Sequence, residues 1–127
     1  MKKDYKINKS ELGTKSGFDF PLSDESTPIT TGVKYTTRLV YSLELEQIRC
    51  ICTVTPTTTS INVDMFKNGV SILTTKCIIP IGATISNLGV LNNTTILDTD
   101  IISFTVLQGD VAGAGLKIQG KGWELNN

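Results

Sequence analysis

Residues 33–45 read VKYTTRLVYSLEL, and two kinds of side chain alternate along this run. One parity holds valine, tyrosine, threonine and leucine, whereas the other holds mainly charged and hydroxyl residues, with Val40 as its apolar exception. Because successive side chains of a strand point to opposite faces, the run predicts a single strand that buries one face and exposes the other.

Shorter runs repeat this pattern further along the chain. Residues 47–55 predict a second strand, which ends at Pro56. Residues 61–73, INVDMFKNGVSIL, predict a hairpin, because Asn-Gly at positions 68–69 tolerates the positive φ angles of a type I′ turn. The side chains expected to face the core from these segments are Ile48, Cys50, Cys52, Val54, Ile61, Val63, Met65 and Val70, together with Ile72 or Leu73.

The last third of the chain predicts three more strands around a loop-rich stretch. A short strand at 76–81 stops at proline and glycine, residues 82–99 favour loops, and strands follow at 98–110 and 115–125. The expected core residues of the last two strands are Ile102, Phe104, Val106, Leu116 and Ile118, with Trp123 as a further candidate. Helix signals are almost absent, so about seven or eight strands predict an all-β protein, a single antiparallel β-sandwich of jelly-roll type.

Residues 1–31 differ from the rest, because no period of 2 or 3.6 persists among their five lysines and five acids. We therefore expect two parts, an irregular N-terminal arm at 1–31 that anchors the chain or orders on a partner, and a sandwich domain at 32–127. Phe18, Phe20 and Leu22 alternate within the arm. They predict either a short strand, which Pro21 would confine to a sheet edge, or a contact with a partner, to which Val40 also contributes.

Composition limits the class of protein. A chain of 127 residues, 39% hydrophobic and 19% charged, is the size of one soluble domain. Its formal net charge of zero argues against nucleic-acid binding. No apolar run reaches the roughly 18 residues of a membrane span, and the start MKKDYKINKS lacks the apolar core of a secretory signal. Three cysteines cannot all pair, and we expect Cys50 and Cys52 to be buried thiols without a disulfide.

Residues with catalytic chemistry are scarce. The chain has no histidine, which removes the usual base of serine and cysteine nucleophiles. The acid pairs at Glu44/Glu46 and Asp98/Asp100 fit solvent-exposed positions or strand entries better than glycoside hydrolysis. Asp98, Asp100 and Asp110 could together offer oxygen ligands to calcium, but turn formation is the favoured role. We expect no catalytic residue, no metal and no cofactor.

An exposed aromatic side chain is the remaining candidate for ligand binding. Trp123 lies near the end of the chain and is less committed to the core than the tyrosines at positions 35 and 41. Such a ring could stack on a sugar, as in β-sandwich binding modules. The sequence therefore keeps glycan binding by Trp123 as an alternative.

Three segments carry a resemblance to a known family: RLVYSLELEQIRC at 38–50, INVDMFKNGVSILTT at 61–75, and LDTDIISFTVLQGDVAGAGLKIQGKGW at 97–123. Together they resemble a β-sandwich module of tailed-bacteriophage structural proteins, with its KNG-x-SIL hairpin, acidic strand entry and GAGLKV-like closing strand. The resemblance covers residues 33–123. Met-Phe at 65–66 and the middle stretch 79–93 depart from the family pattern.

The resemblance implies a non-enzymatic virion component of the capsid-decoration, head-fibre or tail-fibre type. Its expected partners are other virion proteins and further copies of itself, with no nucleic acid and no membrane. Its expected location is the virion, assembled in the host cytoplasm. The alternative function is a carbohydrate-binding module that recognises a glycan on the host surface.

Overall fold

A computed structural model of the chain describes residues 12–125. Every regular element in this range is a β-strand, and the range contains no helix. The strands are β1 (Leu12–Pro21), β2 (Gly32–Thr37), β3 (Leu43–Ile51), β4 (Ile61–Lys67), β5 (Val70–Ser71), β6 (Leu73–Thr75), β7 (Cys77–Ile79), β8 (Val90–Leu91), β9 (Thr95–Ile96), β10 (Ile102–Gln108) and β11 (Lys117–Leu125).

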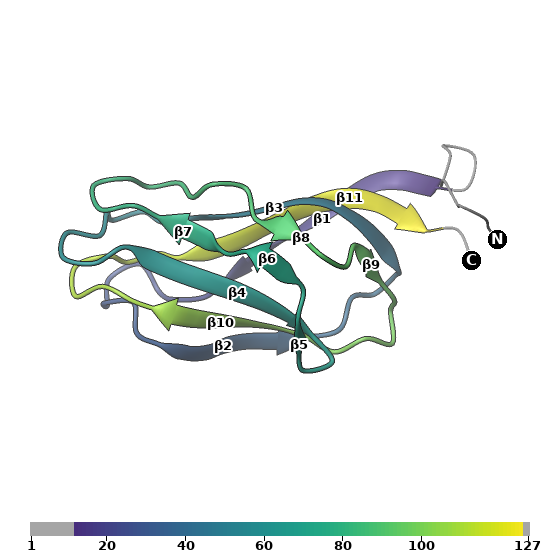
Figure 1. Cartoon of the computed structure of the whole chain (residues 1–127), viewed down its shortest axis with the longest axis horizontal. Helices are drawn as coiled ribbons and strands as arrows, with labels where there is room; N and C mark the ends of the chain where they lie inside the picture. The colour runs from purple at the N-terminus through teal and green to yellow at the C-terminus, as the bar shows by residue number, and fades with distance from the viewer. Residues whose placement is uncertain (1–11, 126–127) are drawn as a thin grey trace.

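Two antiparallel sheets form the body of the molecule (Figure 1). The first, which we call the β11 sheet, has the strand order β1-β11-β3-β9. The second, the β10 sheet, has the order β2-β10-β4-β5, and β7 also pairs with β4. Strands β6 and β8 form a separate two-stranded pair. The predicted antiparallel β-sandwich is thereby confirmed.

The core lies between the two sheets and draws on both. Strands β10 and β4 bury alternate residues, as the sequence predicts, and β3 and β11 supply the opposite wall. Its members at 0–1% exposure include Ile48, Cys50, Ile61, Val63, Met65, Ile102, Phe104, Val106, Leu116 and Ile118. Burial of such side chains contributes roughly 1.5–3 kcal/mol each, so these alternating positions supply much of the stability of the sandwich.

The run at 33–45 is not the single strand that its alternation predicts. Residues 32–37 form β2 in one sheet, whereas residue 43 begins β3 in the other, so the chain crosses between sheets in the interval. A bulge at Lys34 turns Val33 outward, because Tyr35 pairs with Phe104 but Val33 pairs with Thr105. Val33 is therefore 63% exposed despite its predicted core position.

A second bulge lies inside β3, which contains parts of two segments that the sequence predicts as separate strands. Strand β3 runs without interruption through Glu46, where Lys121 pairs with Gln47 but Gly122 pairs with Leu45. Because the bulge adds one residue, the buried parity changes from Leu43 and Leu45 to Ile48 and Cys50 within one strand. The predicted strand at 47–55 is thus the second half of β3, and Val54 beyond it is 44% exposed instead of buried.

The predicted arm at 1–31 is wrong for the described residues 12–31. Strand β1 pairs with β11 from Leu12 to Pro21, and Leu22 and Ile29 beyond it are in the core. Of the two alternatives for this segment, the edge strand is confirmed, with its proline at the sheet edge. Glycine and polar residues hide the strand period in the sequence. Residues 1–11 lie outside the described range, so the sandwich domain begins before the predicted boundary at 32.

The Asn68-Gly69 hairpin and the buried thiols are confirmed. Asn68 has φ of 52° and Gly69 has φ of 85°, and they connect β4 to β5. Val70 beside the turn is 67% exposed, which corrects its predicted inward position, because it lies at the tip of the hairpin. Within the described range Cys50, Cys52 and Cys77 are all free and buried.

Candidate functional site

The predicted partner-binding residues of the N-terminal segment pack within their own chain, with Leu22 in the core and Phe18 and Phe20 half-buried against it. The rings of Phe18 and Phe20 stack with their centroids 4.9 Å apart, and each centroid lies 5.8 Å from that of Phe104. Leu22 is only 4% exposed. Gly120 makes room for this cluster, because a Cβ there would meet the ring of Phe18. These side chains therefore stabilise the sandwich of their own chain, and not a contact with a partner.

Val40 lies at the surface, whereas Trp123 is half-buried. Val40 is 91% exposed in the segment that crosses between the sheets. Trp123 lies on β11, in register with Lys15 of β1 and Glu44 of β3. The ammonium of Lys15 lies 5.4 Å from the centroid of its ring, so a sugar would have to share this ring with a cation.

The acidic residues act as local hydrogen-bond acceptors. Glu44 accepts hydrogen bonds from the hydroxyls of Thr94 and Thr95, at 2.6 and 2.8 Å. Asp100 accepts the backbone N–H of Leu97 at 2.8 Å and the amide of Asn68 at 2.9 Å. The N–H of Leu97 and, to a lesser extent, the amide of Asn68 lower the pKa of Asp100. These contacts support the turn-forming role that the sequence favours.

Asp110 ties two loops together. Its carboxylate accepts the backbone N–H groups of Thr57, Thr58 and Thr59 at 2.8–3.1 Å, and those of Ala112 and Gly113 at 2.8 and 2.9 Å. Burial raises the pKa of Asp110, but these backbone donors outweigh burial, and the pKa lies well below its usual value. The ionised carboxylate of Asp110 therefore stabilises the folded state.

The three aspartates that could together bind calcium do not all lie close to one another. Asp98 and Asp100 precede β10, whereas Asp110 follows it, so the strand separates them. Among residues 12–125, no group of three acidic or cysteine side chains is placed to hold a metal ion.

Three loops lie together at one end of the sandwich, and we call them the loop end: residues 52–60, 79–89 and 109–116. Residues 22–31 pack beside them, and the exposed Asp24 and Glu25 of that segment accept hydrogen bonds from Gly115 and Thr53 of the loops. Backbone hydrogen bonds join the three loops, from Cys52 to Thr84 at 2.9 Å, from Gly82 to Pro56 at 2.8 Å, and from residue 53 to residue 114 at 3.0 Å. The only charged residue in these loops is the buried Asp110. Their exposed large apolar side chains are Val54, Ile81, Ile85, Leu88 and Val111, between 44% and 72% exposed.

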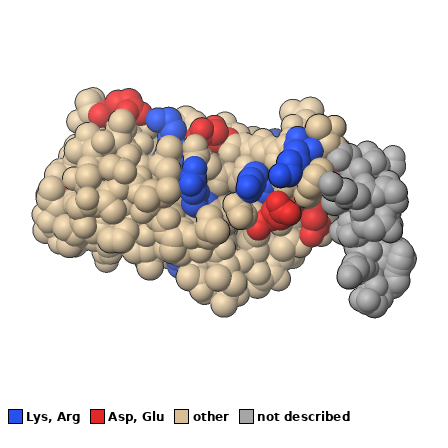
Figure 2. Space-filling view, turned by 90° about the horizontal axis from the view of Figure 1, so that it is seen from above, with Lys and Arg blue, Asp and Glu red and all other residues tan. Residues whose placement is uncertain are grey.

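A groove lies on the outer face of the β11 sheet, beside the loop end. Its volume is about 540 Å³, and ten residues line it: Gly17, Phe18, Asp19, Gln47, Ile48, Arg49, Leu88, Gln119, Gly120 and Lys121. Figure 2 views the molecule from above and shows charged side chains of both signs in a band along this face, next to a broad uncharged surface. No sequence pattern predicts this groove, because its residues come from four separate segments of the chain.

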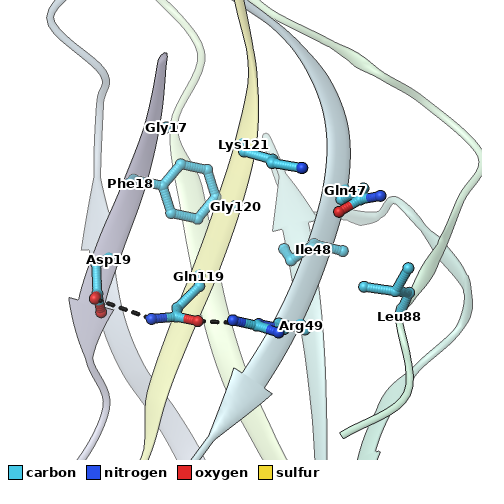
Figure 3. Close-up of a pocket in the computed structure, with 10 residues that line it drawn as sticks. All are labelled: Gly17, Phe18, Asp19, Gln47, Ile48, Arg49, Leu88, Gln119, Gly120 and Lys121. Carbon is cyan, nitrogen blue, oxygen red and sulfur yellow. Dashed lines mark hydrogen bonds between the residues drawn. The ribbon is translucent and has the colours of Figure 1, made fainter. Parts of the chain in front are cut away.

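A row of hydrogen-bonded side chains crosses the floor of the groove (Figure 3). Asp19, Gln119 and Arg49 stand in register on β1, β11 and β3. The Nε of Arg49 donates to Gln119 at 3.0 Å, and the amide of Gln119 donates to Asp19 at 3.1 Å. We call these three residues the polar ladder. Alternate polar residues on β3 and β11 signal the outer face, but only the sheet order brings them together.

Comparison of the chain with known protein families, curated proteins and solved structures finds no match. Within residues 12–125 there is also no helix with the length and apolar character needed to cross a membrane. The features of the protein that bear on its function are therefore the loop end, the groove and the sequence resemblance.

Proposed function

We propose that this protein is a non-enzymatic structural component of a tailed-phage virion, assembled in multiple copies through contacts with other virion proteins. The observation that carries the proposal is the loop end, whose three loops expose large apolar side chains and no charged side chain of their own, with Asp24 and Glu25 at their margin. The centres of protein interfaces are depleted of charged residues in the same way, and clustered exposed apolar side chains are typical of interaction surfaces. The resemblance of residues 33–123 to phage structural modules supports the virion assignment.

The loop end is also ordered enough to serve as a contact surface. Backbone hydrogen bonds and the Asp110 carboxylate hold its three loops to one another, so little ordering entropy is lost on contact. Residues 1–11 join β1 at Leu12, which pairs with Leu125 at the opposite end of the sandwich. The anchoring role predicted for the N-terminal arm now applies to residues 1–11 alone, as part of this proposal.

Two matched variants test the loop end. Val111→Asp places a charge at the loop end, where the valine is 72% exposed, and Val70→Asp places the same charge at the hairpin tip, where the valine is 67% exposed. Both should fold, because both sites are exposed. We expect Val111→Asp to lower incorporation into particles by about tenfold or more, since a charge must be desolvated at the contact, and Val70→Asp to leave incorporation unchanged.

The readouts are mass spectrometry of purified particles of a phage that encodes the chain, and light scattering of the purified protein for its oligomeric state. Equal incorporation of both variants would show that the loop end is not the contact. Absence of the wild-type protein from particles would overturn the virion assignment itself.

Carbohydrate binding stays as a second candidate function, because the outer face of the β11 sheet carries both Trp123 and the groove. Residues 117, 119, 121 and 123 of β11 share this face, since alternate residues of a strand point to the same side.

A further inference from the structure

The groove on the β11 sheet presents polar groups that are held in place and still have bonding capacity. The Nε of Arg49 donates to Gln119, which fixes the plane of the guanidinium. Its terminal N–H groups have no acceptor in the part of the chain that the structure describes. A guanidinium with a fixed plane and two free terminal amines matches the two oxygens of a carboxylate.

The neighbouring row of the sheet adds two more unused side chains. Lys121 and Gln47 pair across β11 and β3, and Gly17 completes the row on β1. Neither Lys121 nor Gln47 forms a side-chain hydrogen bond or ion pair with another residue in the range 12–125. Because Gly17 has no side chain, only backbone lies at the β1 end of this row.

The charges that line the groove favour an anionic ligand. Arg49 and Lys121 are positive, and Asp19 is the only negative residue among the ten that line it. The Asp19 carboxylate already accepts the amide of Gln119. Opposite charge attracts a ligand to a site and orients it there, so the local excess of positive charge selects against a cationic ligand.

The size of the groove and its lining fit a saccharide better than a protein surface. A volume of about 540 Å³ is within the roughly 300–1,000 Å³ range of small-ligand sites. Amide, guanidinium and ammonium groups can donate to ring hydroxyls, and Leu88, 49% exposed, gives an apolar side wall. Trp123 lies two residues beyond Lys121 on the same face of β11, about 7 Å along the strand, within reach of a second sugar unit.

We propose that this groove binds an acidic saccharide. Arg49 and Lys121 hold the sugar carboxylate, and Gln47 with the polar ladder holds its hydroxyl groups. The site extends the carbohydrate-binding candidate by naming the ligand class and the residues. It does not depend on the assembly contact at the loop end, with which it shares only Leu88.

The test uses titration calorimetry on the full chain with tetragalacturonate and 3′-sialyllactose. The matched neutral ligands are the methyl ester of tetragalacturonate and lactose. We expect at least one acidic ligand to bind and its neutral counterpart to bind about tenfold or more weakly. Arg49→Ala should weaken the acidic ligand by about tenfold or more, whereas Arg38→Ala, which removes an equal charge from an exposed residue outside the groove, should not.

Arg49→Lys adds a further readout, because it keeps the charge but loses the planar fork, and it should bind with intermediate affinity. Melting curves establish that each variant is folded. The proposal is overturned if neither acidic ligand binds at millimolar concentration, if the neutral counterparts bind equally well, if Arg49→Ala binds normally, or if inorganic phosphate competes as strongly as the acidic ligand. None of these results bears on the loop-end variants. The saccharide proposal and the assembly proposal can therefore be refuted independently of each other.

Discussion

At the scale of single residues, Asp110 shows how one charged side chain can organise loops that have no regular structure. Its two oxygens accept five backbone N–H groups from residues 57–59 and 112–113. Without an acceptor, buried N–H groups would each cost free energy comparable to a lost hydrogen bond. The loop end therefore depends on this carboxylate, although no chemistry is assigned to it.

Asp110→Asn is expected to lower the melting temperature by about 5–10 °C, because the amide keeps one acceptor oxygen but turns a donor toward backbone donors. The measurement is thermal unfolding followed by circular dichroism. Asp98→Asn is the control, since the Asp98 side chain is exposed and accepts no hydrogen bond within the described range. Equal melting temperatures for Asp110→Asn and the wild type would contradict the role of the carboxylate.

The dependence of stability on pH follows from the same residue. Its pKa is depressed in the folded protein, so the stabilisation is complete above the unfolded value of about 3.9. As the pH falls below about 4, the unfolded state binds more protons than the folded state, and stability falls. Urea titrations between pH 2 and 7 should show this decline. In Asp110→Asn the decline should be smaller, and a decline as steep as in the wild type would assign it to other carboxylates.

At the scale of elements, two bulges decide which faces are buried. The bulge at Glu46 lets β3 bury both parities in turn, and the bulge at Lys34 exposes Val33. In each case the extra residue reverses the alternation that a regular strand would keep. Alternation in the sequence therefore locates strand-forming residues well but does not locate strand ends.

The Asn68-Gly69 turn can be tested on its own. Gly69→Val places a β-branched residue at φ of 85°, a conformation that costs roughly 1–3 kcal/mol. We expect the urea midpoint to fall accordingly, while Val70→Ala at the exposed neighbouring position leaves it nearly unchanged. A stable Gly69→Val protein would indicate that the hairpin can close through another turn.

Strand β1 gives a truncation series with opposite expected results. Removal of residues 2–11 should leave the melting temperature within a few degrees, because it spares β1. Removal of residues 2–21 deletes the edge strand with Phe18 and Phe20, and should unfold the protein or leave it aggregated, because β11 and the core lose their cover.

The same series tests the anchor. The protein without residues 2–11 should fold but fail to incorporate into particles. Full incorporation of this shortened protein would remove residues 1–11 from the proposed function and leave the loop end as the contact.

At the scale of the whole molecule, the first and last described strands pair with each other, and the sandwich encloses its three thiols. Burial raises the pKa of Cys50, whereas a hydrogen bond with Cys50 lowers the pKa of Cys77. Cys77 has an exposure of 0%, so its lower pKa does not expose it to reagents in solution.

Labelling with a thiol reagent should therefore report global opening. We expect Cys50 and Cys77 to react at one shared slow rate that rises with urea, and Cys52, which is 7% exposed, to react earlier. Peptide mass spectrometry of the quenched reaction separates the three sites. Immediate labelling of Cys77 in native buffer would mean that the sandwich opens locally at β7.

The sequence by itself determined the all-β class, the hairpin turn and most of the inward residues of β4, β10 and β11. These features depend on alternation, turn residues and β-branched composition. Each of these patterns involves only residues that are close together in the sequence, so it can be recognised without the fold. The sequence likewise contains no histidine, so the chain lacks the usual base of serine and cysteine nucleophiles whatever its fold.

Only the tertiary structure decided that β1 belongs to the sandwich, that residues 33–45 divide between two sheets, and where the loop end and the groove lie. The polar ladder joins residues that are up to 100 positions apart, from Asp19 to Gln119. Such contacts depend on strand order and register, which follow from how all strands pack at once. No local pattern in the sequence carries that information, because a strand alternates in the same way whichever neighbours it pairs with.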